Sequence, residues 1–553
     1  ATSEVKGTSS VTINGGTIKG IAYGAVADNA DTSSAAVVGG GLANGAGSSA
    51  SVTNTSVTID GEKTAVNGKV VAGGLAINGG TTAVGGKTLL TMKNGTVTGD
   101  LIGGNLLEKG GKNIDSPIDS TTVKVESGTV AGEIYGGSYV RNTDATSEVA
   151  NTAVNISGGT IGAKVPQSWA QYVVGGGKAM SDSTTTQSDV TNTATVDISG
   201  GNITRGAVVG GGFARAQGTK GSATAEVENS VVNLTGGSLV GVVGGGLAEN
   251  LGTETATATV NVTGAAKLTI DGNATVNGII YKGNDAGDTT PSAAVIGGGL
   301  AYGANTNSVL GSKEAPVTSS VTINGGTFEP GANGHYAKIV AGSVVANKGG
   351  TAIVHGDTTL AMAGGTAHDD LIGGGMVENA ATLSKESTSG HNLNITGDSS
   401  VTVTGDSKAL GEVIGGNYVK TSTSRVNSAK VANSSVTITG GTFANVGDSA
   451  SKAQYIIGGS KTNASGGGNA TTLVEGNSSV LIDGDVTIED GALIGGSQAK
   501  AGNGAQSKAT ATVGNSSVTV NKGTLAGVIG GGIADTYYGG KGTPPIATSA
   551  VKG

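Results

Sequence analysis

Apolar and polar residues alternate in many short runs along this chain. Examples are SVTING at residues 10–15 and SVTITG at residues 435–440. A period of two places Val436 and Ile438 on one face of a strand and Thr437 on the other. We therefore predict short β-strands separated by turns that contain Gly and Asn, because no segment has a convincing helical period.

A second pattern, an apolar pair followed by a Gly run, occurs with small variations in fourteen places at intervals of 30 to 53 residues. Self-similarity at such a period is typical of solenoids and repeat arrays. The predicted fold is all-β: an elongated β-solenoid, that is a parallel β-helix, with about three short strands per rung and roughly fourteen repeat units. The pairs begin at Val37, Val71, Leu101, Ile134, Val173, Val208, Val242, Val295, Val340, Leu371, Val413, Ile456, Leu493 and Val528.

The glycines need an explanation, because they weaken isolated strands. In residues 230–249, SVVNLTGGSLVGVVGGGLAE, three of them follow a good strand pattern. Equivalent residues of successive solenoid rungs lie about 4.8 Å apart, so each corner must bend tightly. Gly permits positive φ and close backbone approach there, and we predict a structural role. Surplus residues, such as the tract 380–400, are expected to leave the solenoid as loops suited to binding.

A longer repeat is superimposed on the first. Residues 34–46, SAAVVGGGLANGA, match residues 292–304, SAAVIGGGLAYGA. Seven units followed by seven related units indicate a tandem duplication, with blocks at residues 1–266 and 267–553 in one continuous rod. Neither terminal stretch has the character of a cap, so we expect a longer array, or ends that abut identical subunits.

Composition limits which side chains can fill the core and which partners the chain is expected to bind. The 553 residues include 103 Gly, 3% aromatic residues and no Cys, while 36% are hydrophobic. This suits a thin core of small and β-branched side chains. The net charge is −8, and the four Arg are scattered, so no nucleic-acid partner is expected. No apolar run is long enough for a transmembrane helix, and the lack of Cys fits a cytosolic protein or a disulfide-free surface protein equally well.

Few residues are candidates for chemistry. The four His are His335, His355, His368 and His391. His368 is followed by Asp369 and Asp370, which could indicate a metal site or a general base. Because no second His lies at ligand spacing, we expect a solvated loop instead.

A run of acidic residues could suggest calcium. Residues 481–491, LIDGDVTIEDG, hold Asp483, Asp485, Glu489 and Asp490. They lack the EF-hand loop and the GGxGxD repeat, so we expect ordinary turn carboxylates. We predict no catalytic, cofactor-binding or metal-binding residues and no cofactor. The outward Thr residues could form an ice- or sugar-facing ladder, although uneven unit lengths argue against a regular one.

The phrases S-V-T-I-x-G-G-T and V-[VI]-G-G-G resemble the Gly-rich β-helix passenger domains of bacterial autotransporter adhesins, over nearly the whole chain. The resemblance implies a right-handed parallel β-helix, an extracellular location on the bacterial cell surface, and adhesive or scaffolding use.

Repetition without a catalytic constellation favours a structural protein and not an enzyme. We expect a cell-surface stalk, fibre or adhesin segment of a larger bacterial repeat protein that presents variable loops to surface ligands. The alternative is a β-helical polysaccharide-degrading enzyme or a phage tail-fibre protein, for which Trp169 and eleven Tyr could supply aromatic platforms. The expected partners are adjacent repeats or identical subunits stacked end to end.

Overall fold

The computed structural model confirms a parallel β-solenoid, and the residues that it describes form strands and turns without a helix. Contacts group the chain into two units, each described by itself below: residues 1–240 with 249–262, and residues 241–248 with 263–279 and the described part of 284–553. The described residues are 1–21, 35–113, 117–162, 171–253, 255–279, 293–329, 337–346, 350–379, 391–421, 426–443, 454–502, 507–537 and 544–552.

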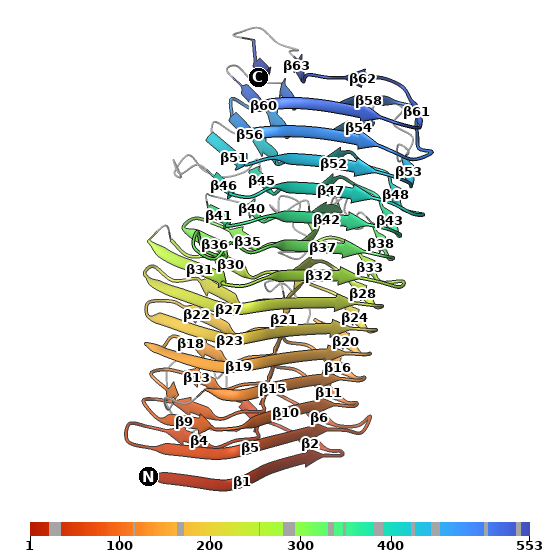
Figure 1. Cartoon of the computed structure of the whole chain (residues 1–553). Helices are drawn as coiled ribbons and strands as arrows, with labels where there is room; N and C mark the ends of the chain where they lie inside the picture. The colour runs from red at the N-terminus through yellow and green to blue at the C-terminus, as the bar shows by residue number, and fades with distance from the viewer. Residues whose placement is uncertain are drawn as a thin grey trace. The chain divides into compact units, whose positions relative to one another are not determined.

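Each rung of the first unit contributes strands to four parallel sheets, and strands equivalent in the repeat lie side by side (Figure 1). The pair sheet holds the apolar pairs: β3 (Ala35–Val38), β7 (Lys69–Val71), β12 (Leu101–Ile102), β17 (Ile134–Tyr135), β21 (Tyr172–Val174) and β25 (Ala207–Val209). The post-glycine sheet follows the Gly run: β4 (Leu42–Asn44), β8 (Leu75–Ile77), β13 (Leu106–Glu108), β18 (Tyr139–Arg141), β22 (Lys178–Ser181), β26 (Phe213–Ala216) and Glu249 and Asn250 of β30 (Leu247–Asn250).

Two further sheets complete these rungs. The long-strand sheet holds β1 (Thr2–Ile13), β5 (Ser49–Ile59), β9 (Thr81–Val84), β10 (Lys87–Met92), β14 (Lys112–Asn113), β15 (Ile118–Val125), β19 (Ala145–Ile156), β23 (Thr185–Ile198), β27 (Gly221–Leu234) and β31 (Ala256–Val262). The short-strand sheet holds β2 (Thr17–Ile18), β6 (Ala65–Val66), β11 (Thr96–Val97), β16 (Thr129–Val130), β20 (Thr160–Ile161), β24 (Asn202–Ile203) and β28 (Ser238–Leu239).

The second unit repeats this arrangement. Its pair sheet holds β29 (Val242–Val243), β34 (Ala293–Ile296), β39 (Lys338–Val340), β44 (Leu371–Ile372), β49 (Val413–Ile414), β54 (Gln454–Ile457), β58 (Gly491–Ile494) and β62 (Val528–Ile529). Its post-glycine sheet holds β35 (Leu300–Tyr302), β40 (Val344–Ala346), β45 (Met376–Asn379), β50 (Tyr418–Thr421), β55 (Lys461–Ala464), β59 (Gln498–Gly502) and β63 (Ile533–Tyr537).

The remaining strands of the second unit are again long or short. The long strands, many divided in two, are β32 (Ala266–Ile270), β36 (Thr306–Leu310), β37 (Ser319–Ile323), β41 (Gly350–Val354), β42 (Thr358–Met362), β46 (His391–Ile395), β47 (Ser399–Val403), β51 (Val426–Val431), β52 (Ser434–Ile438), β56 (Asn469–Ile482), β60 (Lys508–Val520) and β64 (Ile546–Val551). The short strands are β33 (Thr275–Val276), β38 (Thr327–Phe328), β43 (Thr366–Ala367), β48 (Lys408–Ala409), β53 (Thr442–Phe443), β57 (Thr487–Ile488) and β61 (Thr524–Leu525).

All fourteen apolar pairs that the sequence marks begin in strands of the pair sheets, although Ala72 and Ala341, the second residues of two pairs, lie just beyond β7 and β39. The rung nevertheless uses four strand positions where the sequence pattern suggests about three. The Gly run explains the difference, because it separates the apolar pair from a further short strand on the other side of the corner. The division into related blocks at residues 1–266 and 267–553 stays a prediction about duplication.

Period-two alternation places one face of each long strand in the core. In the first unit a buried column runs through paired positions of successive rungs. Its members are Val57, Leu90, Val123, Val154, Val196 and Val232. Stacking branched residues at the same register fills a thin core without large aromatic side chains, as the composition predicts.

The Gly corner is built by close stacking of backbones. A Cβ atom added to Gly103 would lie 2.2 Å from the carbonyl oxygen of Gly136, one rung on. The Gly103 N–H donates to the Tyr135 carbonyl at 2.8 Å, so the ladder continues round the bend. Positive φ occurs at glycines before the short strands, such as Gly95 and Gly128, and not at Gly103. Close approach, and not a left-handed conformation, is therefore what requires Gly at this corner.

Candidate functional site

The pair sheet and the post-glycine sheet meet at the Gly corner, and their side chains turned away from the core form a second buried layer. The middle residues of successive post-glycine strands, such as Leu107 and Val140, pack into the core. Strand alternation therefore turns the first and third residues of each strand to the opposite side. We call this second layer the corner face.

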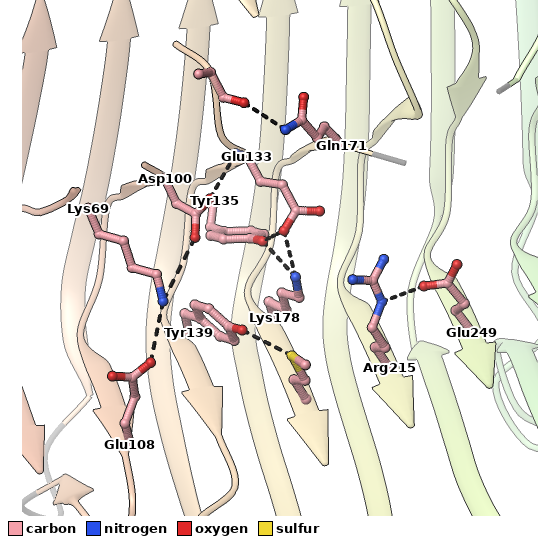
Figure 2. Close-up of polar contacts among 12 residues, drawn as sticks. Lys69, Asp100, Glu108, Glu133, Tyr135, Tyr139, Gln171, Lys178, Arg215 and Glu249 are labelled. Carbon is pink, nitrogen blue, oxygen red and sulfur yellow. Dashed lines mark hydrogen bonds and ion pairs between the residues drawn. The ribbon is translucent and has the colours of Figure 1, made fainter. Parts of the chain in front are cut away.

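A lysine lies at the centre of the corner face in the first unit (Figure 2). Lys178 Nζ is 2.6 Å from Glu133 Oε2 and 2.8 Å from the Tyr135 hydroxyl, and its side chain is only 3% exposed. Its Nζ also lies 5.0 Å from the Tyr139 ring centroid and 4.9 Å from that of Phe213. Burial lowers the pKa of Lys178 to about 8, although the Glu133 carboxylate opposes this shift.

Further ion pairs flank this lysine. Arg215 Nε donates to Glu249 Oε2 at 2.5 Å, and both residues are buried. Lys69 Nζ lies 3.3 Å from Glu108 Oε1 and 4.0 Å from Asp100 Oδ2 (Figure 2). Charged groups at this depth are tolerated when each faces a group of opposite charge.

The second unit contains a corresponding cluster. Lys338 Nζ lies 2.7 Å from Asp369 Oδ1 and 2.8 Å from Asp370 Oδ2, and the three side chains are 9%, 12% and 14% exposed. Lys461 Nζ pairs with Glu412 Oε2. Burial raises the pKa of Asp369 in spite of the Lys338 ammonium group. For Asp370 burial acts in the same direction, but Lys338 and Lys461 together lower its pKa.

The two clusters are built from equivalent positions of the long repeat. EIYGGSYV at residues 133–140 corresponds to EVIGGNYV at residues 412–419, and VVGGGK corresponds to IIGGSK. The charged residues that precede an apolar pair or follow a Gly run in the first unit therefore have counterparts in the second unit, and so do the residues with which they form ion pairs. The corresponding residues are Lys69 and Lys338, Asp100 and Asp370, Glu108 and Glu378, Glu133 and Glu412, Tyr139 and Tyr418, and Lys178 and Lys461.

The expectation of a solvated loop is wrong for Asp369 and Asp370. They directly precede β44, which lies beside β39, and the parallel register brings their carboxylates to Lys338. His368 forms no metal-ligating group with them within the described chain. His335 and Trp169 lie outside the described residues, as does the side chain of His391. His355 is described but joins no such group of described residues.

The acidic run is exposed, as expected for turn carboxylates. Asp483, Asp485, Glu489 and Asp490 are all exposed, and Asp483 accepts a hydrogen bond from Asn521 Nδ2 at 3.1 Å. The described part of the chain holds no group of three metal-ligating side chains.

The outward positions keep their register from rung to rung, but the hydroxyl ladder is interrupted, because Ala361 and Leu481 pair with Thr402 and Thr437 on the strands to either side. Ser400 and Ser435 are paired across β47 and β52, and Thr402 and Thr437 are paired beside them. Length differences are taken up elsewhere in the rung, so the register of these strands is retained. Binding of ice or sugar by this face stays the less favoured alternative, which this register does not test.

An open hollow lies on the post-glycine sheet of the second unit. Its volume is about 360 Å³, and it is lined by Asn463, Ser465, Lys500, Gly502, Asp535, Thr536 and Tyr537. The Lys500 and Asp535 side chains are about half exposed and 4.0 Å apart, so this pair is solvated, unlike those of the corner face.

Sequence reasoning missed the corner face because a charged residue beside an apolar pair is usually exposed. Its signal is the recurrence of oppositely charged residues at the same register of neighbouring rungs. Comparison with known proteins adds no assignment, since no family model, no curated protein and no solved structure matches the chain. Among the residues described, no helix has the length and apolarity needed to cross a bilayer.

Proposed function

We propose that this chain is a structural repeat protein: a stalk, fibre or adhesin segment on a bacterial cell surface. The single observation that supports this best is that buried charged groups form ion pairs between neighbouring rungs. Lys178, Arg215, Lys338 and Lys461 each face a carboxylate from a neighbouring rung, and the arrangement is built twice. Such groups contribute to how one rung stacks on the next.

The same geometry argues against the alternative of a polysaccharide-degrading enzyme. Such an enzyme requires two carboxyl groups that flank the scissile bond, and usually aromatic side chains on which sugars stack. Tyr135, Tyr139 and Tyr418 are buried in the corner face, where a polymer has no access. The Asp369 and Asp370 carboxylates are close together, but Lys338 lies between them.

Adjacent repeats or further copies of the chain are the proposed partners. Rungs pair in parallel register with the rungs before and after them, as β12 does with β7 and β17, so a further repeat is the partner that fits this backbone best. Open strand edges with apolar side chains are templates for pairing with another chain.

Two measurements test this function. The purified chain should release no reducing ends from a panel of bacterial surface polysaccharides, and turnover of any of them would contradict the proposal. Electron microscopy should show end-to-end particles, and Val528→Lys should reduce their length by placing a charge at the exposed edge. Thr437→Lys, on the outward face of β52, is the matched control and should leave the particles unchanged.

A further inference from the structure

The strongest unexplained arrangement is a single amine held between two carboxyl groups in a buried site. Lys338 lies in β39, and Asp369 and Asp370 precede β44, the neighbouring strand of the pair sheet. Lys338 Nζ is within 2.8 Å of an oxygen of each carboxyl group. The Tyr418 ring centroid is 5.9 Å from the same nitrogen. A nucleophile, a possible electrophile and a base are thus in contact, shielded from bulk water.

We propose that Lys338 and Asp369 condense to form an isopeptide bond that covalently links two successive rungs. Asp370 is the base in this reaction. The bond would form whatever ligand the chain binds, so the proposal does not rest on the proposed function.

The protonation state of Asp369 favours its role as electrophile, whereas the deprotonation of Lys338 is uphill. Burial raises the pKa of Asp369, which makes the neutral carboxylic acid more accessible and hence a better electrophile. Lys338 begins as an ammonium group, because the Asp370 and Asp369 carboxylates raise its pKa although burial alone would lower it. Transfer of one proton from Lys338 to Asp370, 2.8 Å away, yields the neutral amine. This transfer costs free energy, because the pKa of Lys338 is raised and that of Asp370 is lowered. Positioned groups in a desolvated site gain most from proximity.

The covalent step balances without a co-reactant. The neutral Lys338 nitrogen attacks Cγ of the protonated Asp369 and forms a C–N bond. The Cγ–OH bond breaks, and the hydroxyl leaves as water with the second proton lost from the nitrogen. The first proton remains on Asp370, which later returns it to solvent. The products are one amide and one water molecule.

The chain contains its own control for this geometry. Lys69 and Asp100 occupy the equivalent positions in the first unit, but Gly99 stands where the second unit has Asp369. Lys69 Nζ lies 4.0 Å from Asp100 Oδ2. Without an adjacent second carboxyl group on the same turn, we expect this pair to remain ionic.

Intact-mass spectrometry of the denatured full-length chain tests the proposal. The mass should be lower than that calculated from the sequence by one water molecule. Fragmentation of a protease digest should give one branched peptide that joins Lys338 to Asp369. An unshifted mass would overturn the proposal, as would a branched peptide that maps to other residues.

Variants separate the chemistry from mere ion pairing. Lys338→Arg retains the positive charge but has no amine nucleophile, so the calculated mass should be restored. Lys69→Arg should leave the deficit of one water. Asp370→Asn removes the base and should abolish or strongly slow the reaction. A deficit that persists in Lys338→Arg would contradict the assignment even if another variant failed to fold.

Discussion

At the level of residues, the buried ion pairs of the corner face have more influence on folding than exposed pairs on the long strands. Arg215 and Glu249 are almost fully buried, whereas the Lys430 and Glu475 side chains are 44% and 50% exposed in their own 2.7 Å pair. Removing one member of a buried pair leaves an uncompensated charge in a medium of low polarity. The same change at the surface leaves a charge that water can solvate.

This contrast gives a direct comparison. Arg215→Met should destabilise the fold by about 3–5 kcal/mol, because Glu249 remains buried without its cation. Lys430→Met should cost less than about 1 kcal/mol. Urea unfolding followed by circular dichroism measures both. Equal shifts of the two midpoints would show that the corner-face pair is no more important than the exposed one, and Arg215→Met with Glu249→Leu should recover much of the loss.

A second residue-scale prediction concerns acidic side chains that face each other across rungs. Asp189 is paired in register with Glu148 and Glu226, and it accepts a hydrogen bond from Gln187 Nε2 at 2.6 Å. Burial raises the pKa of Asp189 to about 7, helped by the Glu226 and Glu148 charges. The folded chain therefore holds a proton that the unfolded chain releases near pH 4, and this group lowers stability progressively as the pH rises from about 4 to 7.

Asp189→Asn removes that ionisation. We expect it to stabilise the fold by about 1–3 kcal/mol at pH 8, since one pKa unit corresponds to about 1.4 kcal/mol, and to have little effect at pH 4. Urea midpoints at the two pH values test this. Asp119→Asn, which removes a negative charge at an exposed position of β15, is the control variant. A gain at pH 4 equal to that at pH 8 would disprove the linkage.

At the level of elements, the strands and corners could be predicted from the sequence, but the corner face could not. Period two and the apolar pairs locate the strands, because both follow from which side chains enter the core. The sequence of a single strand does not show that side chains turned away from the core, such as those of Glu133 and Asp370, are also buried. That depends on the angle between two sheets, which the Gly run only implies. The fourth strand position of the rung is missing from the sequence prediction because the Gly run separates the apolar pair from the short strand that follows it.

Substitution of two glycines by alanine tests whether close backbone stacking explains the Gly corner. Gly103→Ala places Cβ 2.2 Å from a carbonyl oxygen of the next rung, so the backbones must move apart. Gly85 has no atom within 4 Å of the added Cβ. We expect Gly103→Ala to lower the free energy of unfolding by about 1–3 kcal/mol. Gly85→Ala should change it by less than about 1 kcal/mol. If both variants unfold at the same urea concentration, close stacking does not explain the glycines.

Asn and Ser replace glycine at this corner in several rungs, and the stacking of the backbones is retained. Asn105 Oδ1 accepts the Gly74 N–H at 2.8 Å, and Ser138 Oγ accepts the Asn105 N–H at 3.0 Å. Asn417 and Ser460 form the same contact in the second unit. This explains why the third position of the Gly run is Gly, Asn or Ser in different rungs. A short side chain is tolerated there when its oxygen accepts a hydrogen bond from the neighbouring rung. The sequence shows the variation but not this partner.

At the level of the whole molecule, nearest-neighbour contact is the property that most distinguishes this chain from a globular protein. The β12 strand, for example, pairs with β7 and β17, the equivalent strands of the rungs before and after it. In such an array, stability is approximately a sum of rung terms and interface terms, so damage to one rung should spread only a short way. A globular core would instead transmit the loss to all its strands.

Hydrogen exchange measured by mass spectrometry can follow that spread. In Gly103→Ala, exchange should accelerate in peptides that cover β7, β12 and β17, because these strands share the altered corner. Peptides that cover β56 and β60, which pair with each other in the second unit, should retain wild-type rates under native conditions. The reciprocal variant, Gly495→Ala, would bring Cβ within 2.6 Å of the Gly530 carbonyl oxygen, and should affect β54, β58 and β62 while leaving β12 unchanged. Uniform acceleration along the chain in either variant would mean that the rungs unfold as one cooperative body, and the additive description would then have to be abandoned.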